Sequence, residues 1–162
     1  MKNVLTSLAV AAAVLTAPAA HAADKLLLKT PIAFSTALPG LGSPIPRVAE
    51  QLDLMSGGTL RMKVYEPGKL VPAFEILDAV STGKINSGYT TAGYWAGKIP
   101  AAPLFSAVPF GPEAGEYMAW LYYGNGMNLY QEMYDQAGYN VHVMPCAVIA
   151  PETSGWFAKE IN

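Results

Sequence analysis

The first residues that could do chemistry in this chain are soft metal ligands. His142, Met144 and Cys146 recur at every second position of an apolar stretch, so on a strand all three would face one side. Copper accepts such ligands. The alternative is the core face of a buried strand, where Cys and Met are ordinary apolar residues. We favour the core face, because blue-copper sites use two histidines and His142 is the sole histidine after residue 22.

The carboxylates come in pairs three residues apart on expected helices. The pairs are Glu75/Asp78, Glu113/Glu116 and Glu132/Asp135. Such pairs usually lie on solvated helix faces, whereas acid–base catalysis needs perturbed groups that face a cleft. The chain also has no Gly-x-Ser-x-Gly nucleophile motif. We therefore predict that the protein is not an enzyme, with a secreted hydrolase or a copper-handling protein as the alternatives.

Three residues that follow expected strands are the better candidates for a ligand site. Tyr94 and Trp95 lie between Gly93 and Gly97, after a short expected strand. Ligands of open α/β sheets bind outside the carboxyl ends of the strands, where aromatic side chains with a polar tip suit a small organic acid. Glu152 follows the last expected strand, and its carboxylate is a ligand type that hard cations prefer. Packing for the aromatic pair and a surface loop for Glu152 remain the alternatives.

Hydrophobic periodicity places these residues within alternating strands and helices. Alternation or short apolar runs predict strands at 26–34, 60–65, 85–90 and 139–149. Helical spacing predicts helices at 44–55, 71–81, 112–123 and 127–137. Ser43 is the expected N-cap of the first helix, with Pro44 in its first turn, and Gly57 and Gly58 are expected to end it. This order indicates an α/β fold with largely parallel strands.

Composition and the N-terminus restrict the location and the partners. Lys2 precedes the apolar run Val4–Leu15, and Ala20-His21-Ala22 fits a cleavage site, so residues 1–22 are predicted to be a secretory signal peptide. This predicts a periplasmic protein. The net charge is −2 and the basic residues are not clustered, which argues against nucleic acid as a partner. Cys146 is the only cysteine, so no internal disulfide can form.

Several segments together resemble the solute-binding proteins of tripartite ATP-independent periplasmic (TRAP) transporters. They keep the order and approximate spacing of that family over nearly all of residues 26–162. The segments are Ser56-Gly57-Gly58-Thr59-Leu60, Lys63-Val64-Tyr65, Val71-Pro72-Ala73-Phe74-Glu75, Asp78-Ala79-Val80-Ser81, Tyr94-Trp95-Ala96-Gly97-Lys98, Val108-Pro109-Phe110-Gly111, Ala119-Trp120-Leu121-Tyr122-Tyr123-Gly124 and Ser154-Gly155-Trp156-Phe157. They most resemble the subgroup that takes 2-oxo and 2-hydroxy monocarboxylates.

The resemblance implies a periplasmic binding protein-like fold, in which two α/β lobes joined by a hinge close over an organic acid. Residues 23–138 would form an incomplete first lobe, and residues 139–162 the crossover and the start of the second lobe. The expected partner is a sodium-driven TRAP permease. A bound Na⁺ or Ca²⁺ beside the ligand and a homodimer are left open, and no other cofactor is expected.

The resemblance also assigns site residues. Tyr94 matches the aromatic position that touches the ligand, and Glu152 falls where the subgroup usually carries Gln, close to ligand and cation. The arginine that binds the ligand carboxylate in this family has no counterpart here, since neither Arg47 nor Arg61 matches it. We therefore expect the chain to be the N-terminal portion of a longer protein, and to bind organic acids weakly when it is expressed alone.

Overall fold

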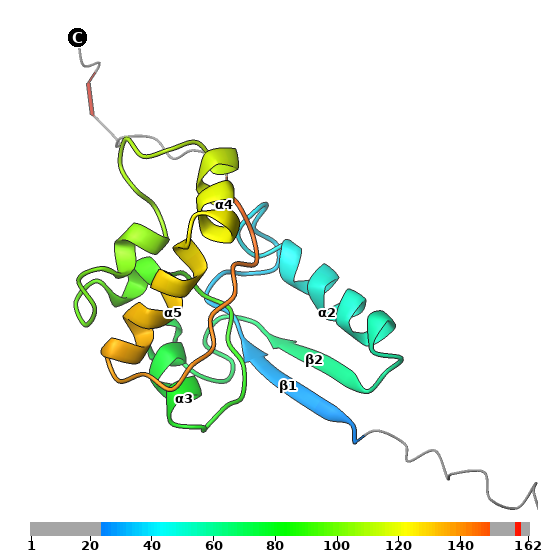
Figure 1. Ribbon diagram of the computed structural model, residues 1–162. Helices are drawn as coiled ribbons and strands as arrows, with labels where there is room; N and C mark the ends of the chain where they lie inside the picture. The colour runs from blue at the N-terminus through cyan, green and yellow to red at the C-terminus, as the bar shows by residue number, and fades with distance from the viewer. Residues whose placement is uncertain (1–23, 150–157, 160–162) are drawn as a thin grey trace, which may run out of the picture.

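The computed structural model of the protein describes residues 24–149 and 158–159 (Figure 1). Its first half is a β–α–β unit made of β1 (Leu26–Pro31), α2 (Pro44–Met55) and β2 (Leu60–Tyr65). The two strands pair in parallel, in a register that runs from Leu26 opposite Leu60 to Pro31 opposite Tyr65. The predicted parallel pairing is confirmed. The predicted signal peptide and Glu152 lie outside the described residues.

The first helix begins and ends where the sequence predicts. Ser43 is the N-cap residue and Pro44 occupies the first turn, where the missing N–H of proline leaves no hydrogen bond unmade. The Ser43 side chain does not cap the helix, however, and its hydroxyl instead accepts a hydrogen bond of 3.2 Å from the Gly40 N–H. Gly57 and Gly58 end the helix with φ of 59° and 80°, conformations that favour glycine.

The predicted third strand is correctly placed but mostly not formed. Tyr89 makes the only strand-like pairing in this stretch, a parallel bridge with Ile32, in which the Tyr89 N–H donates to the Pro31 carbonyl at 3.0 Å. Further back along β1 a side chain takes the place of a neighbouring strand. The Asn86 amide accepts from the Lys29 N–H at 2.8 Å and donates to the Leu27 carbonyl at 2.9 Å. Asn86 thereby satisfies the outer edge of β1.

The second half of the described chain consists of short helices around an aromatic core. The elements are the 3₁₀ turn η2 (Ala73–Glu75), α3 (Ile76–Ser81), the 3₁₀ turns η3 (Ala92–Trp95) and η4 (Ala102–Phe105), α4 (Ala114–Tyr123) and α5 (Gly126–Gln136). Figure 1 shows α3 and α5 on the other side of β1 from α2. Residues from α3, η3, η4 and α5 form the main core: Ile76, Leu77, Ala92, Trp95, Ile99, Ala102, Met133 and Tyr134.

The predicted strand at 139–149 is wrong, because the segment has no strand partner among the described residues. It is held by a side chain instead: Gln131 on α5 donates to the Val141 carbonyl at 2.7 Å and accepts from the Val143 N–H at 3.0 Å. Val141 and Val143 pack against the core. His142, Met144 and Cys146, which alternate with these valines, are exposed. The interpretation of these three residues as a core face is therefore also wrong.

The described residues include no helix long and apolar enough to cross a membrane. What they form is a mixed α/β unit. Its strands run parallel, so their carboxyl ends meet at one edge of the sheet.

Candidate functional site

Three aromatic rings meet at the edge where the parallel strands end. Phe34 follows β1, Phe74 follows β2 on η2, and Tyr94 follows the 85–90 segment on η3. The Tyr94 ring centroid lies 4.7 Å from that of Phe74 and 5.7 Å from that of Phe34. We call Phe34, Phe74 and Tyr94 the aromatic cluster. It lies at the position where open α/β sheets bind ligands.

The buried Trp95 ring packs against Tyr94 and holds it in place. The two rings meet edge to face, with centroids 6.3 Å apart. Trp95 is only 1% exposed, and its carbonyl accepts hydrogen bonds from the Lys98 and Ile99 N–H groups at 2.8 and 2.7 Å. This burial argues against the direct ligand contact expected for Trp95. Its side chain anchors η3 in the core and so positions Tyr94, which is half-buried.

The loop that carries Phe34 is tied to the ends of the neighbouring strands. Thr36 donates its N–H to Glu66 Oε2 at 3.3 Å and its hydroxyl to Oε1, which joins the loop to the end of β2. The same hydroxyl contact is the main reason why the pKa of Glu66 is lowered. The Tyr89 hydroxyl donates to the Leu41 carbonyl at 2.6 Å. The loop is therefore anchored by both β2 and the 85–90 segment.

Gly42 closes this loop and tolerates no side chain. A Cβ at this position would lie 1.9 Å from the Ser35 carbonyl oxygen, a backbone atom that cannot move aside cheaply. The close approach of the two loop ends holds the residues that follow β1, including Phe34, beside the strand ends.

Hydroxyl groups flank η3, the turn that carries Tyr94. The Thr91 and Ser106 hydroxyl oxygens lie 2.8 Å apart, just before η3 and just after η4. Thr90 Oγ1 is buried and has no hydrogen-bond partner among the described residues. Hydroxyl groups of this kind are able to donate hydrogen bonds to a carboxylate, but Thr91 and Ser106 are paired with each other and Thr90 Oγ1 is buried.

The arginines lie elsewhere in the described structure. Arg61 is at the amino end of β2, with 68% of its side chain exposed and its Nε 3.6 Å from Asp53 Oδ1. Arg47 lies on α2 and is exposed. Lys98 forms an ion pair with Asp78, the hydrogen bond that chiefly raises the pKa of Lys98. Neither arginine belongs to the aromatic cluster.

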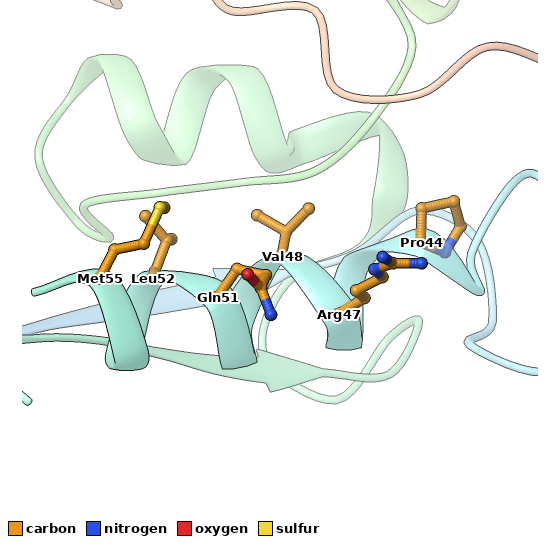
Figure 2. Close-up of a pocket in the computed structure, with 6 residues that line it drawn as sticks. All are labelled: Pro44, Arg47, Val48, Gln51, Leu52 and Met55. Carbon is orange, nitrogen blue, oxygen red and sulfur yellow. The ribbon is translucent and has the colours of Figure 1, made fainter.

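A shallow hollow of about 330 Å³ lies along α2, and it differs in kind from the aromatic cluster (Figure 2). Its lining residues are Pro44, Arg47, Val48, Gln51, Leu52 and Met55. All six come from this one helix and project from the same side of it. Ligand sites for small acids bring together polar groups from several elements, so a helix face of this kind is a poor candidate.

The other candidates from the sequence lie at the surface of the described structure. His142, Met144 and Cys146 are exposed, and the residues that the structure describes contain no group of three or more His, Cys, Asp and Glu that could hold a metal ion. Of the paired carboxylates, Glu132 accepts from Gln136, Asp135 accepts from Gln131, and Asp78 pairs with Lys98.

Phe34 and Phe74 were missed from the sequence, where Phe34 belongs to the predicted first strand and Phe74 to the apolar residues of a predicted helix. The signal that could have found them is positional: each lies shortly after a strand whose carboxyl end meets the same edge as the Tyr94 segment.

Similarity to known proteins agrees with this geometry. Residues 45–143, more than half of the chain, match the family described as bacterial extracellular solute-binding protein, family 7. The monocarboxylate 2-oxoacid-binding periplasmic protein of Nostoc sp. is 38% identical over 115 residues, which are 71% of this chain and 31% of that protein.

Two solved structures combine similar sequence with similar fold. They are TRAP periplasmic solute-binding proteins, from Pseudoalteromonas atlantica with bound sodium and pyruvate and from Colwellia psychrerythraea with bound calcium and pyruvate. Each is 34% identical with a TM-score of 0.66, and each match covers 71% of this chain and 35% of the other. The chain thus spans about a third of the length of these relatives. The chain belongs to the bacterial extracellular solute-binding proteins of family 7, with the α/β fold of the TRAP periplasmic binding proteins.

Proposed function

We propose that the protein is the periplasmic binding component of a TRAP transporter. It captures a small 2-oxo or 2-hydroxy monocarboxylate and delivers it to a sodium-driven membrane permease, without catalysis. The observation that carries this proposal is the aromatic cluster at the carboxyl edge of the sheet, in a chain that belongs to family 7. The predicted signal peptide at residues 1–22 supports the periplasmic location.

The relatives support the choice of ligand. The curated relative is named for 2-oxoacid binding, and the two solved relatives hold pyruvate together with sodium or calcium. The aromatic cluster, with two apolar rings and one phenol, is chemically suited to an acid that is partly apolar. A cation bound with the ligand is part of the proposal, and the Glu152 carboxylate is its proposed oxygen ligand, which would also remove the repulsion between two anions.

The proposed roles of the site residues follow from their burial. Tyr94 contacts the ligand directly, because its ring is half-buried at the strand ends. Trp95 does not contact the ligand; its buried ring fixes the position of Tyr94. The two lobes of the full-length protein, divided near residue 138, would close over the acid, and the second lobe would supply the positive charge.

Isothermal titration calorimetry of the full-length gene product with pyruvate, lactate and succinate tests this proposal. We expect micromolar binding of the monocarboxylates, stronger with added Na⁺ or Ca²⁺ than after chelation. Tyr94→Ala should weaken binding by at least tenfold, about 1.4 kcal/mol. Tyr123→Ala is the matched control, since Tyr123 is 92% exposed at the end of α4. Equal binding by both variants would contradict the role of Tyr94, and no binding by the unmodified protein would contradict the function.

A further inference from the structure

The aromatic cluster also indicates which residue sets ligand selectivity. We propose that Phe74 is the specificity-determining residue of this site: its ring forms the outer wall that limits the length of the apolar side group on the bound acid. This inference rests on the proposed function, because it concerns the choice among monocarboxylates at the same site.

The backbone that carries Phe74 is fixed, while its ring is not buried. Phe74 lies in the 3₁₀ turn η2, where the Glu75 N–H donates to the Pro72 carbonyl at 2.9 Å. Ile76, which begins α3, is 1% exposed in the core and anchors the turn. The Phe74 ring itself is 63% exposed. An apolar ring that is held in a fixed turn beside Tyr94 is placed to contact a ligand bound at Tyr94.

The Phe74 ring packs against the ring of Tyr94. Its only aromatic neighbour among the described residues is Tyr94, at a centroid distance of 4.7 Å and an interplanar angle of 32°. Tyr94 in turn contacts the half-buried Phe34. Exposure thus increases from Phe34 to Phe74, and Phe74 lies at the outer end of a continuous wall of rings. A group that extends along this wall from the strand ends would reach Phe74 last.

The chemistry of the wall specifies the class of ligand. Phe34 and Phe74 carry no polar atom in their side chains, and the Tyr94 hydroxyl is the one polar group on the wall, so the wall takes an apolar side group and offers no positive charge to a second carboxylate. Burying an unpaired charge against such a surface is costly. We infer that the site takes monocarboxylates with a short apolar side group and excludes dicarboxylates. The length limit is set by the Phe74 ring.

Calorimetry of the full-length gene product with a graded series of acids tests this inference. The series is glyoxylate, pyruvate, 2-oxobutanoate, 4-methyl-2-oxopentanoate and succinate. In Phe74→Ala, the Kd for 4-methyl-2-oxopentanoate relative to that for pyruvate should fall by about tenfold or more, the size expected when a pocket gains room for extra methylene groups. Phe74→Leu should show a smaller shift in the same direction. Tyr123→Ala should leave the ratio unchanged.

The outcomes separate this inference from the proposed function. An unmodified protein that binds none of the monocarboxylates would contradict both. An unmodified protein that binds them, with a Phe74→Ala variant that binds all of them with an unchanged ratio, would overturn the role of Phe74 and leave the proposed function intact. Circular dichroism and a Tm close to that of the unmodified protein show that both Phe74 variants are folded, so that a change in ratio reports on selectivity.

Discussion

At the scale of single residues, the site depends on contacts that hold its loops in place. Glu66 follows β2 directly and receives two hydrogen bonds from Thr36 in the loop after β1. The hydroxyl bond favours the charged form of the carboxylate, which lowers its pKa below the usual value of 4.5. The contact is therefore linked to pH, and it joins the segments that carry Phe34 and Phe74.

A pH series of thermal unfolding on Glu66→Gln tests this contact. Because the folded-state pKa is lowered, the stabilisation is complete above about pH 4.5 and is lost as the pH falls through the folded-state pKa. The unmodified protein should have the higher Tm at pH 7, and the difference should shrink steadily below pH 4.5. Glu50→Gln, an exposed change on α2, is the control. A Tm difference independent of pH would contradict the charge linkage.

At the scale of elements, side-chain amides replace missing strands in two places. Asn86 pairs with Leu27 and Lys29 on the edge of β1, and Gln131 pairs with Val141 and Val143. In both cases one carboxamide donates to a carbonyl and accepts from the N–H two residues later. That is the pattern a neighbouring strand would present. The amides satisfy backbone groups that would otherwise lack partners.

Replacing Gln131 with Ala should therefore release the 139–149 segment. Two partly buried hydrogen bonds are lost, and we expect a decrease in unfolding free energy of about 1–3 kcal/mol. Hydrogen exchange of the Val143 amide should accelerate in the same variant, since its N–H donates to Gln131. Gln136→Ala on the same helix is the control: its bond to Glu132 is exposed, and it should change stability by less than about 0.5 kcal/mol. Equal effects of both variants would contradict the pairing.

These elements also show where sequence patterns succeed. The β1–α2–β2 unit was predictable because its periodicity, its proline at the helix start and its glycines at the helix end all act locally. The strands at 85–90 and 139–149 were not, since a strand needs a partner and periodicity says nothing about which backbone lies alongside. Tyr94 was singled out from its position after an expected strand. Phe34 and Phe74 were missed because an apolar pattern does not distinguish a core ring from an exposed one.

At the scale of the whole molecule, the proposed function makes the described residues one side of a binding site. In that proposal the aromatic cluster supplies apolar contact, whereas neither arginine belongs to the cluster. Arg61 is at the opposite, amino end of β2 and pairs with Asp53, and Lys98 pairs with Asp78. A buried carboxylate needs a charged or multiply hydrogen-bonded partner. In the proposed function, that partner is a residue of the opposing lobe in the full-length protein.

A direct comparison of two polypeptides tests whether the opposing lobe supplies the cationic partner. A polypeptide of these 162 residues and the full-length gene product would be titrated with pyruvate under identical conditions. We expect micromolar affinity only for the longer protein. In the shorter polypeptide, moving the ligand carboxylate out of water without a cationic partner would cost more free energy than the apolar contacts return. Circular dichroism and the Val143 amide exchange establish that the shorter polypeptide is folded. Micromolar binding by the folded shorter polypeptide would contradict a cationic partner on the opposing lobe. The partner would then be one of these 162 residues. The variants Arg47→Ala and Arg61→Ala would show whether either arginine is that partner.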